Sequence, residues 1–227
     1  MLDAPTPAPP DDRLLRLPDP LVLALIALYC TVEVILQGAD RHLWGSVLWR
    51  PLANQNGGFW AGLMRGGWLA NYPGQTAVMF FTHSVLHAGL SHLLGNMAAL
   101  VALANLIGGR LPRTEFLALW IASALAGALA FALLGPVSQP MVGTSGALFG
   151  LAGLLVAWEV RSGRAAGLSL PRVMLSLLIW VLGLALLNLA CWWLQNGVLA
   201  WQAHLGGFIA GLLWGLLRPQ RLAKTLS

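Results

Sequence analysis

The sequence predicts an all-α membrane protein, a bundle of six transmembrane helices, and two observations support this fold class. Of its 227 residues, 58% are hydrophobic and only 9% are charged, whereas soluble domains carry roughly 25% charged residues. The mean hydropathy is +0.73. So few charges cannot cover a water-facing surface, and the apolar residues collect in six stretches. This pattern is typical of a polytopic helical membrane protein.

The six apolar stretches have lengths close to that of a membrane-spanning helix. A helix rises about 1.5 Å per residue, so about 20 residues cross the roughly 30 Å of hydrocarbon in a bilayer. We predict one membrane domain over residues 20–218, between a disordered cytoplasmic tail at 1–19, rich in proline, and a cytoplasmic tail at 219–227. The stretches are Leu21–Gln37, Ala88–Gly108, Phe116–Leu134, Ser145–Val160, Val173–Leu194 and Leu199–Leu217.

Arginine and lysine residues predict the orientation of the chain, because cytoplasmic loops of membrane proteins are enriched in them. The loops on one side of a six-span arrangement hold Arg13, Arg16, Arg110, Arg113, Arg161, Arg164, Arg172, Arg218, Arg221 and Lys224, and those on the other hold Arg41, Arg50 and Arg65. We therefore predict cytoplasmic termini and a plasma (inner) membrane location. The net charge of +5 is explained by these basic edges, so no nucleic-acid partner is expected.

The first outer loop, residues 38–78, is long and rich in aromatic side chains. Tryptophan and tyrosine favour the membrane–water interface, where an apolar ring can lie beside a wet polar edge. Glycine, asparagine and proline residues break the loop into short pieces. We expect it to lie partly in the outer leaflet. Its aromatic residues are Trp44, Trp49, Phe59, Trp60, Trp68 and Tyr72.

A few polar residues occur inside the apolar stretches, where such residues are costly and therefore candidates for function. His92 and Asn96 lie in the first turns of the second span, Ser145 begins the fourth, and His204 lies near the start of the sixth. In a chain with both termini inside, these three spans all begin at the outer face. The four side chains are therefore expected at similar depth.

The fourth span is short, because the stretch from Ser145 to Glu159 would form a helix of only about 22 Å. If Glu159 lies at the inner edge, Ser145 lies about 8–10 Å below the outer surface. The loop before it, Gly135–Thr144, must then dip into the membrane, which is tolerated where backbone is buried in protein or lines a watery cavity. A serine at such a place is a candidate for chemistry.

Glycines repeat along the fourth and sixth spans at a spacing that lets membrane helices approach closely. Close approach would bring the Ser145 hydroxyl within hydrogen-bond reach of His204. The glycines are Gly146, Gly150 and Gly153 on the fourth span, and Gly207, Gly211 and Gly215 on the sixth.

Three motifs, in the second, fourth and sixth spans, resemble those of the rhomboid family of intramembrane serine proteases. Gly143-Thr144-Ser145-Gly146 is similar to the family's Gly-x-Ser-Gly, and His92 with Asn96 to its His-x-x-x-Asn. His204 stands in Ala-His-Leu-Gly-Gly, which resembles the family's motif in the sixth span. The resemblance covers the six-span core from about Phe80 to Leu217. Many members carry Trp-Arg just before the histidine cluster, whereas here Trp49-Arg50 lies far upstream.

The resemblance implies a role for each matching residue. Ser145 would be the nucleophile and His204 the general base, a dyad with no acidic third member. The Ser145 backbone N–H and the side chains of His92 and Asn96 would hold the oxyanion. The supporting residues would be Gly143, Gly146, Phe149, which packs against the catalytic imidazole, and His87, which we expect to be structural or to help shape the water-filled cavity.

The resemblance also implies partners and a path for them. The expected substrates are single-span membrane proteins that are cut near the outer face and enter sideways from the bilayer. Span five and the loop Gln195–Val198 would form the moving gate. No cofactor is implied, and nothing in the sequence indicates an oligomeric state.

Other interpretations of these residues remain open. Ser145 could ease helix packing, and His204 could be a hydrogen-bonded core histidine. His83 and His87 could ligate a metal, but no carboxylate or cysteine lies near to complete a site, so no metal is expected. Glu33 is expected near the outer edge, paired or solvated, and Asn188 could bond a neighbouring helix. The alternative functions are a catalytically silent rhomboid-like protein that binds membrane clients and, less favoured, a small transporter or channel.

Overall fold

The computed structural model describes residues 18–175, 178–180, 182–183, 186 and 199–218. Its described elements are helical, and an isolated antiparallel bridge joins Phe59 to Met141. Residues 1–17 of the first predicted tail, the whole second tail, most of the predicted fifth span with Asn188, and the predicted gate loop 195–198 lie outside these residues. The predicted tail bound at residue 19 is wrong, because Asp19 is ordered as the N-cap of α1 and accepts the Leu21 N–H. In chain order the helices are α1 (Pro20–Asp40), α2 (Trp49–Gly57), α3 (Ala61–Arg65), α4 (Gln75–Thr82), α5 (Leu90–Ile107), η2 (Gly108–Arg110), α6 (Arg113–Leu134), α7 (Ser145–Ala165) and α9 (Trp201–Leu217).

The predicted membrane-type helical fold is confirmed in its class. Among the described residues, three helical segments are long and apolar enough to cross a membrane, Pro20–Asp40, Leu90–Arg110 and Arg113–Leu134. The six-span arrangement stays a prediction. The helix predicted over Ser145–Val160 is longer than expected, since α7 continues to Ala165. The apolar stretch marks the part suited to hydrocarbon, whereas the helix itself runs on through charged residues whose long side chains can reach water.

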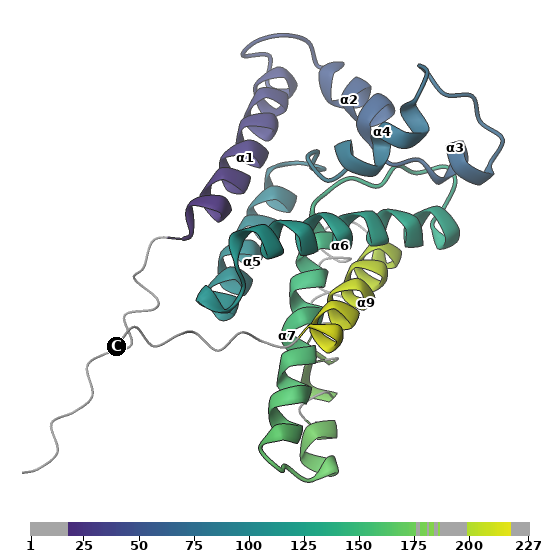
Figure 1. The fold of residues 1–227 in the computed structure, drawn as a ribbon. Helices are drawn as coiled ribbons and strands as arrows, with labels where there is room; N and C mark the ends of the chain where they lie inside the picture. The colour runs from purple at the N-terminus through teal and green to yellow at the C-terminus, as the bar shows by residue number, and fades with distance from the viewer. Residues whose placement is uncertain (1–17, 176–177, 181, 184–185, 187–198, 219–227) are drawn as a thin grey trace, which may run out of the picture.

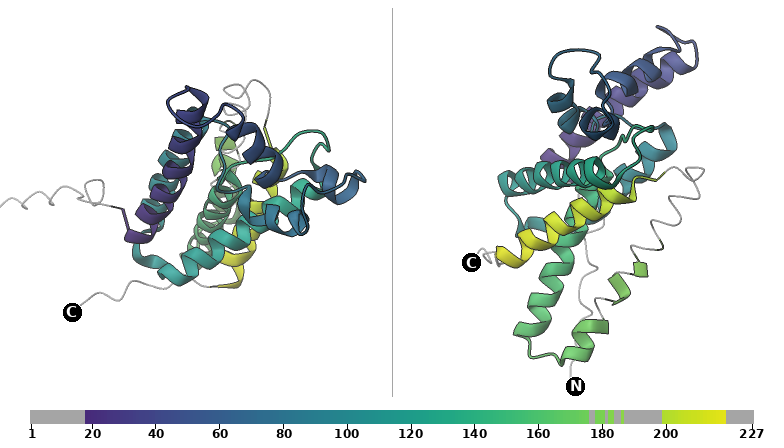
Figure 2. Two further views of the ribbon diagram at one scale, coloured as in Figure 1. Left: turned by 90° about the horizontal axis from the view of Figure 1, so that it is seen from above. Right: turned by 90° about the vertical axis from the view of Figure 1, so that its right-hand side faces the viewer.

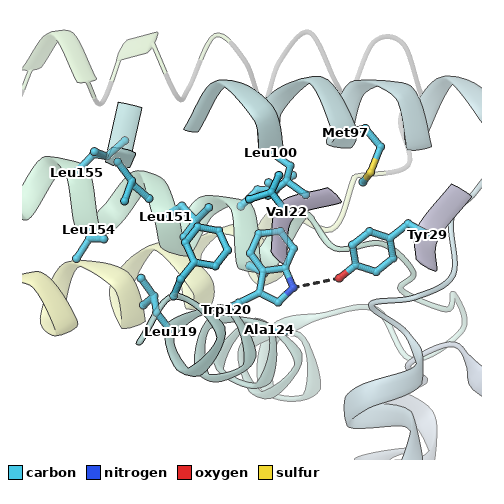
Figure 3. Packing of buried hydrophobic residues seen from close by; sticks show 14 of the residues in the cluster. Val22, Tyr29, Met97, Leu100, Leu119, Trp120, Ala124, Leu151, Leu154 and Leu155 are labelled. Carbon is cyan, nitrogen blue, oxygen red and sulfur yellow. Dashed lines mark hydrogen bonds between the residues drawn. The ribbon is translucent and has the colours of Figure 1, made fainter. Parts of the chain in front are cut away.

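Helix α7 lies at the centre of the bundle, with α5, α6 and α9 packed around it (Figures 1 and 2). Its side chains are buried without interruption from Gly146 to Trp158. The main apolar core combines α7 with residues of α1, α5 and α6, and Figure 3 shows Trp120 of α6 donating a hydrogen bond to the Tyr29 hydroxyl of α1 within it, at 3.0 Å. This contact gives two buried polar groups a hydrogen-bond partner that they would otherwise lack.

The predicted glycine faces do bring α7 and α9 together. A Cβ atom at Gly207 would overlap the carbonyl oxygen of Gly146, and one at Gly211 would overlap that of Gly150. Backbone therefore packs directly on backbone, as small residues allow in membrane helices. The starts of these two helices are thereby fixed relative to each other.

The segment between α1 and α5 lies at one side of the bundle, where α2 packs beside α4 and α3 packs against α6 (Figure 1). Polar contacts to backbone carbonyls fasten it. Arg65 donates to the carbonyls of Ala132, at 2.8 Å, and Gly135, and Thr82 donates to the carbonyl of Gly57 at 2.7 Å. The bridge between Phe59 and Met141 joins this segment to the loop that precedes α7.

Candidate active site

Ser145 and His204 are in direct contact. Ser145 is the first residue of α7, and His204 lies in the first turn of α9. The Ser145 Oγ and His204 Nε2 atoms are 2.8 Å apart, a hydrogen-bond distance. The glycine packing of the two helices explains how residues so distant in sequence meet.

The imidazole of His204 is held flat against an aromatic ring. The rings of Phe149 and His204 are stacked, with centroids 4.2 Å apart and planes inclined by 6°. Phe149 lies one turn after Ser145 on α7, so a single helix carries both the hydroxyl and the surface that orients its partner. His204 itself is buried.

The backbone immediately before Ser145 requires glycine. Gly143 has a φ of 118°, a conformation that residues with a Cβ rarely adopt. A Cβ at this position would also lie 2.7 Å from His92 Cε1 and 3.1 Å from His92 Nε2. The Gly143 N–H donates to the His83 carbonyl at 2.9 Å, which fixes the turn. Gly143 therefore lets the chain pass close beside the His92 ring.

His92 and Asn96 both face this turn. A Cβ at Gly143 would lie 3.6 Å from Asn96 Nδ2, so the amide and the imidazole approach the same two-residue stretch before Ser145. The Asn96 Nδ2 atom is buried and has no hydrogen-bond partner among the described residues. A buried amide donor without a partner is free to donate to an acceptor that is present only during a reaction.

The side chains of His87 and His83 make contacts with other residues. His87 is fully buried, and its ring packs edge-on against Tyr29 and His92 at centroid distances of 5.7 and 5.3 Å. His83 Nδ1 donates to the Met79 carbonyl at 2.8 Å, which occupies one of its possible ligating atoms. In the described part of the chain, no three His, Cys, Asp or Glu side chains are grouped so that they could hold a metal ion.

Two features near the site escaped sequence reasoning. The Tyr29 hydroxyl accepts hydrogen bonds from Trp120 and, at 3.4 Å, from Thr144, the residue that precedes Ser145. A tyrosine inside an apolar stretch was the signal, since its hydroxyl needs a partner when buried. The second feature is the set of contacts around Arg50.

Arg50 is paired with two carboxylates of α1. Its Nη2 lies 2.9 Å from Glu33 and its Nε 2.7 Å from Asp40. Burial by itself lowers the pKa of the guanidinium, but hydrogen bonds and charges of Glu33 and Asp40 outweigh this and raise the pKa. The sequence left open whether Glu33 is paired or solvated, and the structure shows that it is paired.

Comparison with known proteins places this helical bundle in a known class of membrane-embedded proteins. The Rhomboid domain family matches residues 74–221. The chain belongs to the rhomboid family, whose members are generally intramembrane serine proteases.

Individual relatives agree with this assignment. The chain is 34% identical over 144 residues to RHOMBOID-like protein 5 of Arabidopsis thaliana, covering 60% of this chain and 43% of the relative. It is 26% identical over 175 residues to "Putative rhomboid protease YdcA" of Bacillus subtilis (strain 168), covering 77% and 78%. It is 34% identical over 151 residues to RHOMBOID-like protein 1 of Arabidopsis thaliana, covering 62% and 35%. The chain thus spans less than half the length of the two plant relatives.

Proposed function

We propose that this chain is an intramembrane serine endopeptidase that cleaves single-span membrane proteins near the outer face of the plasma (inner) membrane. The observation that carries the proposal is the 2.8 Å contact between Ser145 Oγ and His204 Nε2. A nucleophile and a base within about 2.6–3.2 Å are the signature of nucleophilic catalysis. Family membership makes a peptide bond in a membrane protein the natural target.

The reaction follows from these atoms. Ser145 Oγ attacks the peptide carbonyl while His204 Nε2 takes the hydroxyl proton, and an acyl-enzyme forms as the imidazolium returns that proton to the leaving amine. Water then attacks the acyl carbonyl while His204 Nε2 takes a proton from it, and the imidazolium returns that proton to Ser145 Oγ as the ester bond breaks and the carboxylic acid product leaves. Phe149 keeps the imidazole plane fixed throughout.

Three donors would stabilise the oxyanion in this mechanism. Ser145 begins α7, and the N–H groups of a first helical turn have no partner within the helix. The side chains of His92 and Asn96 approach Gly143 from α5. One such donor is worth roughly 2.7–4 kcal/mol to the transition state.

A dyad suffices for this proposal. The sequence has no Asp or Glu between Asp40 and Glu115 or after Glu159, and Glu33 and Asp40 pair with Arg50. The stacked Phe149 ring takes over part of the orienting role that a carboxylate has in a triad.

Purified protein in detergent or liposomes, offered a single-span reporter, tests the proposal. We expect cleavage by the wild type, and a loss of roughly six orders of magnitude, or down to background, in Ser145→Ala and His204→Ala. Ser162→Ala is the matched control, because it makes the same change on an exposed position of the same helix. Cleavage that persists in Ser145→Ala would contradict the assignment.

A fluorophosphonate probe separates the remaining possibility, a silent protein that binds membrane clients. We expect the probe to label Ser145 in the wild type and in Ser162→Ala, and to leave Ser145→Ala unlabelled. A folded wild-type protein that neither cleaves several reporters nor takes the label would favour the client-binding function.

A further inference from the structure

Arg50 joins three separate segments of the chain. Beside Glu33 and Asp40, it contacts the backbone carbonyl of His87, to which Nη1 donates at 2.8 Å. The Glu33 side chain is 1% exposed and that of Arg50 14%, so this pair is shielded from water. Arginine suits the position because its guanidinium offers five donors in a fixed plane.

The peptide bond that Arg50 holds has a second contact on its other side. The N–H of Ala88, which belongs to the same peptide unit as the His87 carbonyl, donates to His92 Nδ1 at 3.3 Å. A backbone N–H can only donate, so Nδ1 must be the acceptor. The neutral His92 ring then carries its proton on Nε2.

His92 Nε2 is the ring nitrogen nearest the turn before Ser145, beside Cε1, which a Cβ at Gly143 would meet at 2.7 Å. This Cβ would lie 3.1 Å from Nε2. An oxyanion site needs a donor there, and only the Nε2–H form of a neutral ring supplies one. The opposite tautomer would present a lone pair to the developing negative charge.

We propose that the Glu33–Arg50 pair is a positioning device that sets the tautomer of His92 through the His87–Ala88 peptide. The cation on the carbonyl oxygen polarises the peptide and strengthens its N–H as a donor to Nδ1. Glu33 keeps the guanidinium in place at a buried position where a lone charge would be costly. The catalytic meaning of the device rests on the proposed proteolytic function, whereas the tautomer itself does not.

Arg65 provides a matched control within the same segment. Arg65 is more exposed than Arg50. It likewise donates to backbone carbonyls, those of Ala132 and Gly135, but at the end of α6 rather than at the His87–Ala88 peptide. Arg65→Gln and Arg50→Gln therefore remove the same kind of anchor, and only the second touches the path to His92.

The first measurement is the tautomer of His92, read from its ring nitrogens by NMR on protein with ¹⁵N-labelled histidine, with the signals assigned by their loss in His92→Gln. We expect Nε2–H in the wild type and in Arg65→Gln, and a substantial population of Nδ1–H in Arg50→Gln. This readout needs no substrate, so it decides the inference even if the chain proves not to cleave.

The second measurement is the split between kcat and KM on the reporter. We expect Arg50→Gln to lower kcat by roughly 10- to 100-fold, somewhat less than outright removal of an oxyanion donor. KM should stay within about twofold, because the lost interaction acts in the transition state. Arg65→Gln should leave the ratio of the two constants close to that of the wild type.

Three results would overturn the proposal: Nδ1–H in the wild type, an unchanged tautomer in folded Arg50→Gln, or an equal loss of kcat in Arg65→Gln. If Arg50→Gln does not fold, Arg50→Lys serves in its place. Lysine keeps the charge beside Glu33 but cannot reach three acceptors with the same planar geometry, and the same outcomes are read on it. A wild type that fails to cleave yet shows the expected tautomers would sink the proposed function alone.

Discussion

Two regions meet at the candidate active site, and they are held together by different forces. Ser145 and His204 belong to α7 and α9, whose backbones touch at glycines. The turn around His87, next to His92, belongs to the segment before α5, which side chains such as Arg50 fasten through hydrogen bonds to backbone carbonyls. One half of the site is built by close packing and the other by polar contacts.

The difference fits the sequence composition of each region. Between apolar helices in a bilayer there is little hydrophobic driving force, so association depends on close van der Waals contact. The loop segment is rich in aromatic and polar residues suited to the interface, where directional contacts can be made. We infer that packing sets the distance between nucleophile and base, while polar contacts set the orientation of the oxyanion donors.

The largest effect should come from the packed half, with Gly207→Ala. The new Cβ would overlap the Gly146 carbonyl, and forced overpacking costs typically about 1–3 kcal/mol. If the helices separate by even about 1 Å, catalysis can fall roughly 100-fold. Thermal unfolding in detergent and reporter cleavage measure the two effects.

Gly95→Ala is the control for that substitution. Gly95 lies on an exposed face of α5, and a Cβ there would meet nothing within 4 Å. The change should stabilise the helix by about 0.5–1 kcal/mol and leave cleavage intact. Wild-type activity in Gly207→Ala would show that contact between α7 and α9 does not set the site.

A smaller effect is expected for Tyr29→Phe, which removes a hydroxyl shared by the core and the turn before Ser145. Trp120 Nε1 would lose its acceptor in a buried position, at a cost of about 1–3 kcal/mol. Thr144 would lose its contact as well, so the cleavage rate should fall modestly. Thermal unfolding and kcat measure these changes.

Tyr72→Phe gives the comparison in the loop segment. The Tyr72 hydroxyl donates to the Asn56 carbonyl at 2.9 Å in a partly buried place, where water can replace it. We expect less than half the stability loss of Tyr29→Phe and no change in kcat. Equal losses of stability in the two variants would mean that hydrogen bonds in the core and in the loop segment contribute equally to stability.

The contact between Ser145 and His204 was accessible from the sequence because it depends on local patterns. Both residues stand at helix starts, and the glycines that follow each one reveal which faces meet. The stacking of Phe149 on His204 likewise matches the prediction from the family resemblance. The roles of these residues in catalysis stay predictions.

The contacts of Arg50 could not be read from the sequence, because they depend on how a loop returns to the bundle. Arg50 reaches Glu33 on α1 and the carbonyl of His87, 37 residues further along the chain. No periodicity specifies such a path. The sequence identified Trp49-Arg50 only as a departure from the family pattern. The one indication of the contact was Glu33, because a carboxylate in an apolar stretch is costly unless it has a cationic partner.

The smallest effect is expected at the exposed pair of Asp19 and Arg113, which contrasts with the buried pair of Glu33 and Arg50. Their side chains are 44% and 63% exposed, and exposed ion pairs contribute about 0–1 kcal/mol. Asp19 also accepts the N–H of Leu21 at 2.9 Å as the N-cap of α1. Arg113→Gln should therefore change stability by less than about 0.5 kcal/mol, whereas Asp19→Ala should cost about 1 kcal/mol.

The pH dependence of Asp19 separates the cap from the ion pair. The Leu21 N–H lowers the pKa of Asp19 below its ordinary value of 3.8. Burial opposes this effect, and the hydrogen bond and charge of Arg113 lower the pKa further, each by less than the Leu21 N–H does. A lowered folded pKa stabilises the fold above the unfolded value, and this contribution is lost as the pH falls through the folded pKa. Thermal unfolding of the wild type and Arg113→Gln should therefore share an acid-induced loss below about pH 4 that Asp19→Ala lacks. If Arg113→Gln instead removed that loss as fully as Asp19→Ala, the ion pair rather than the helix cap would account for the lowered pKa of Asp19. Exposure of the Asp19–Arg113 pair would then not make its contribution to stability smaller than that of Glu33–Arg50.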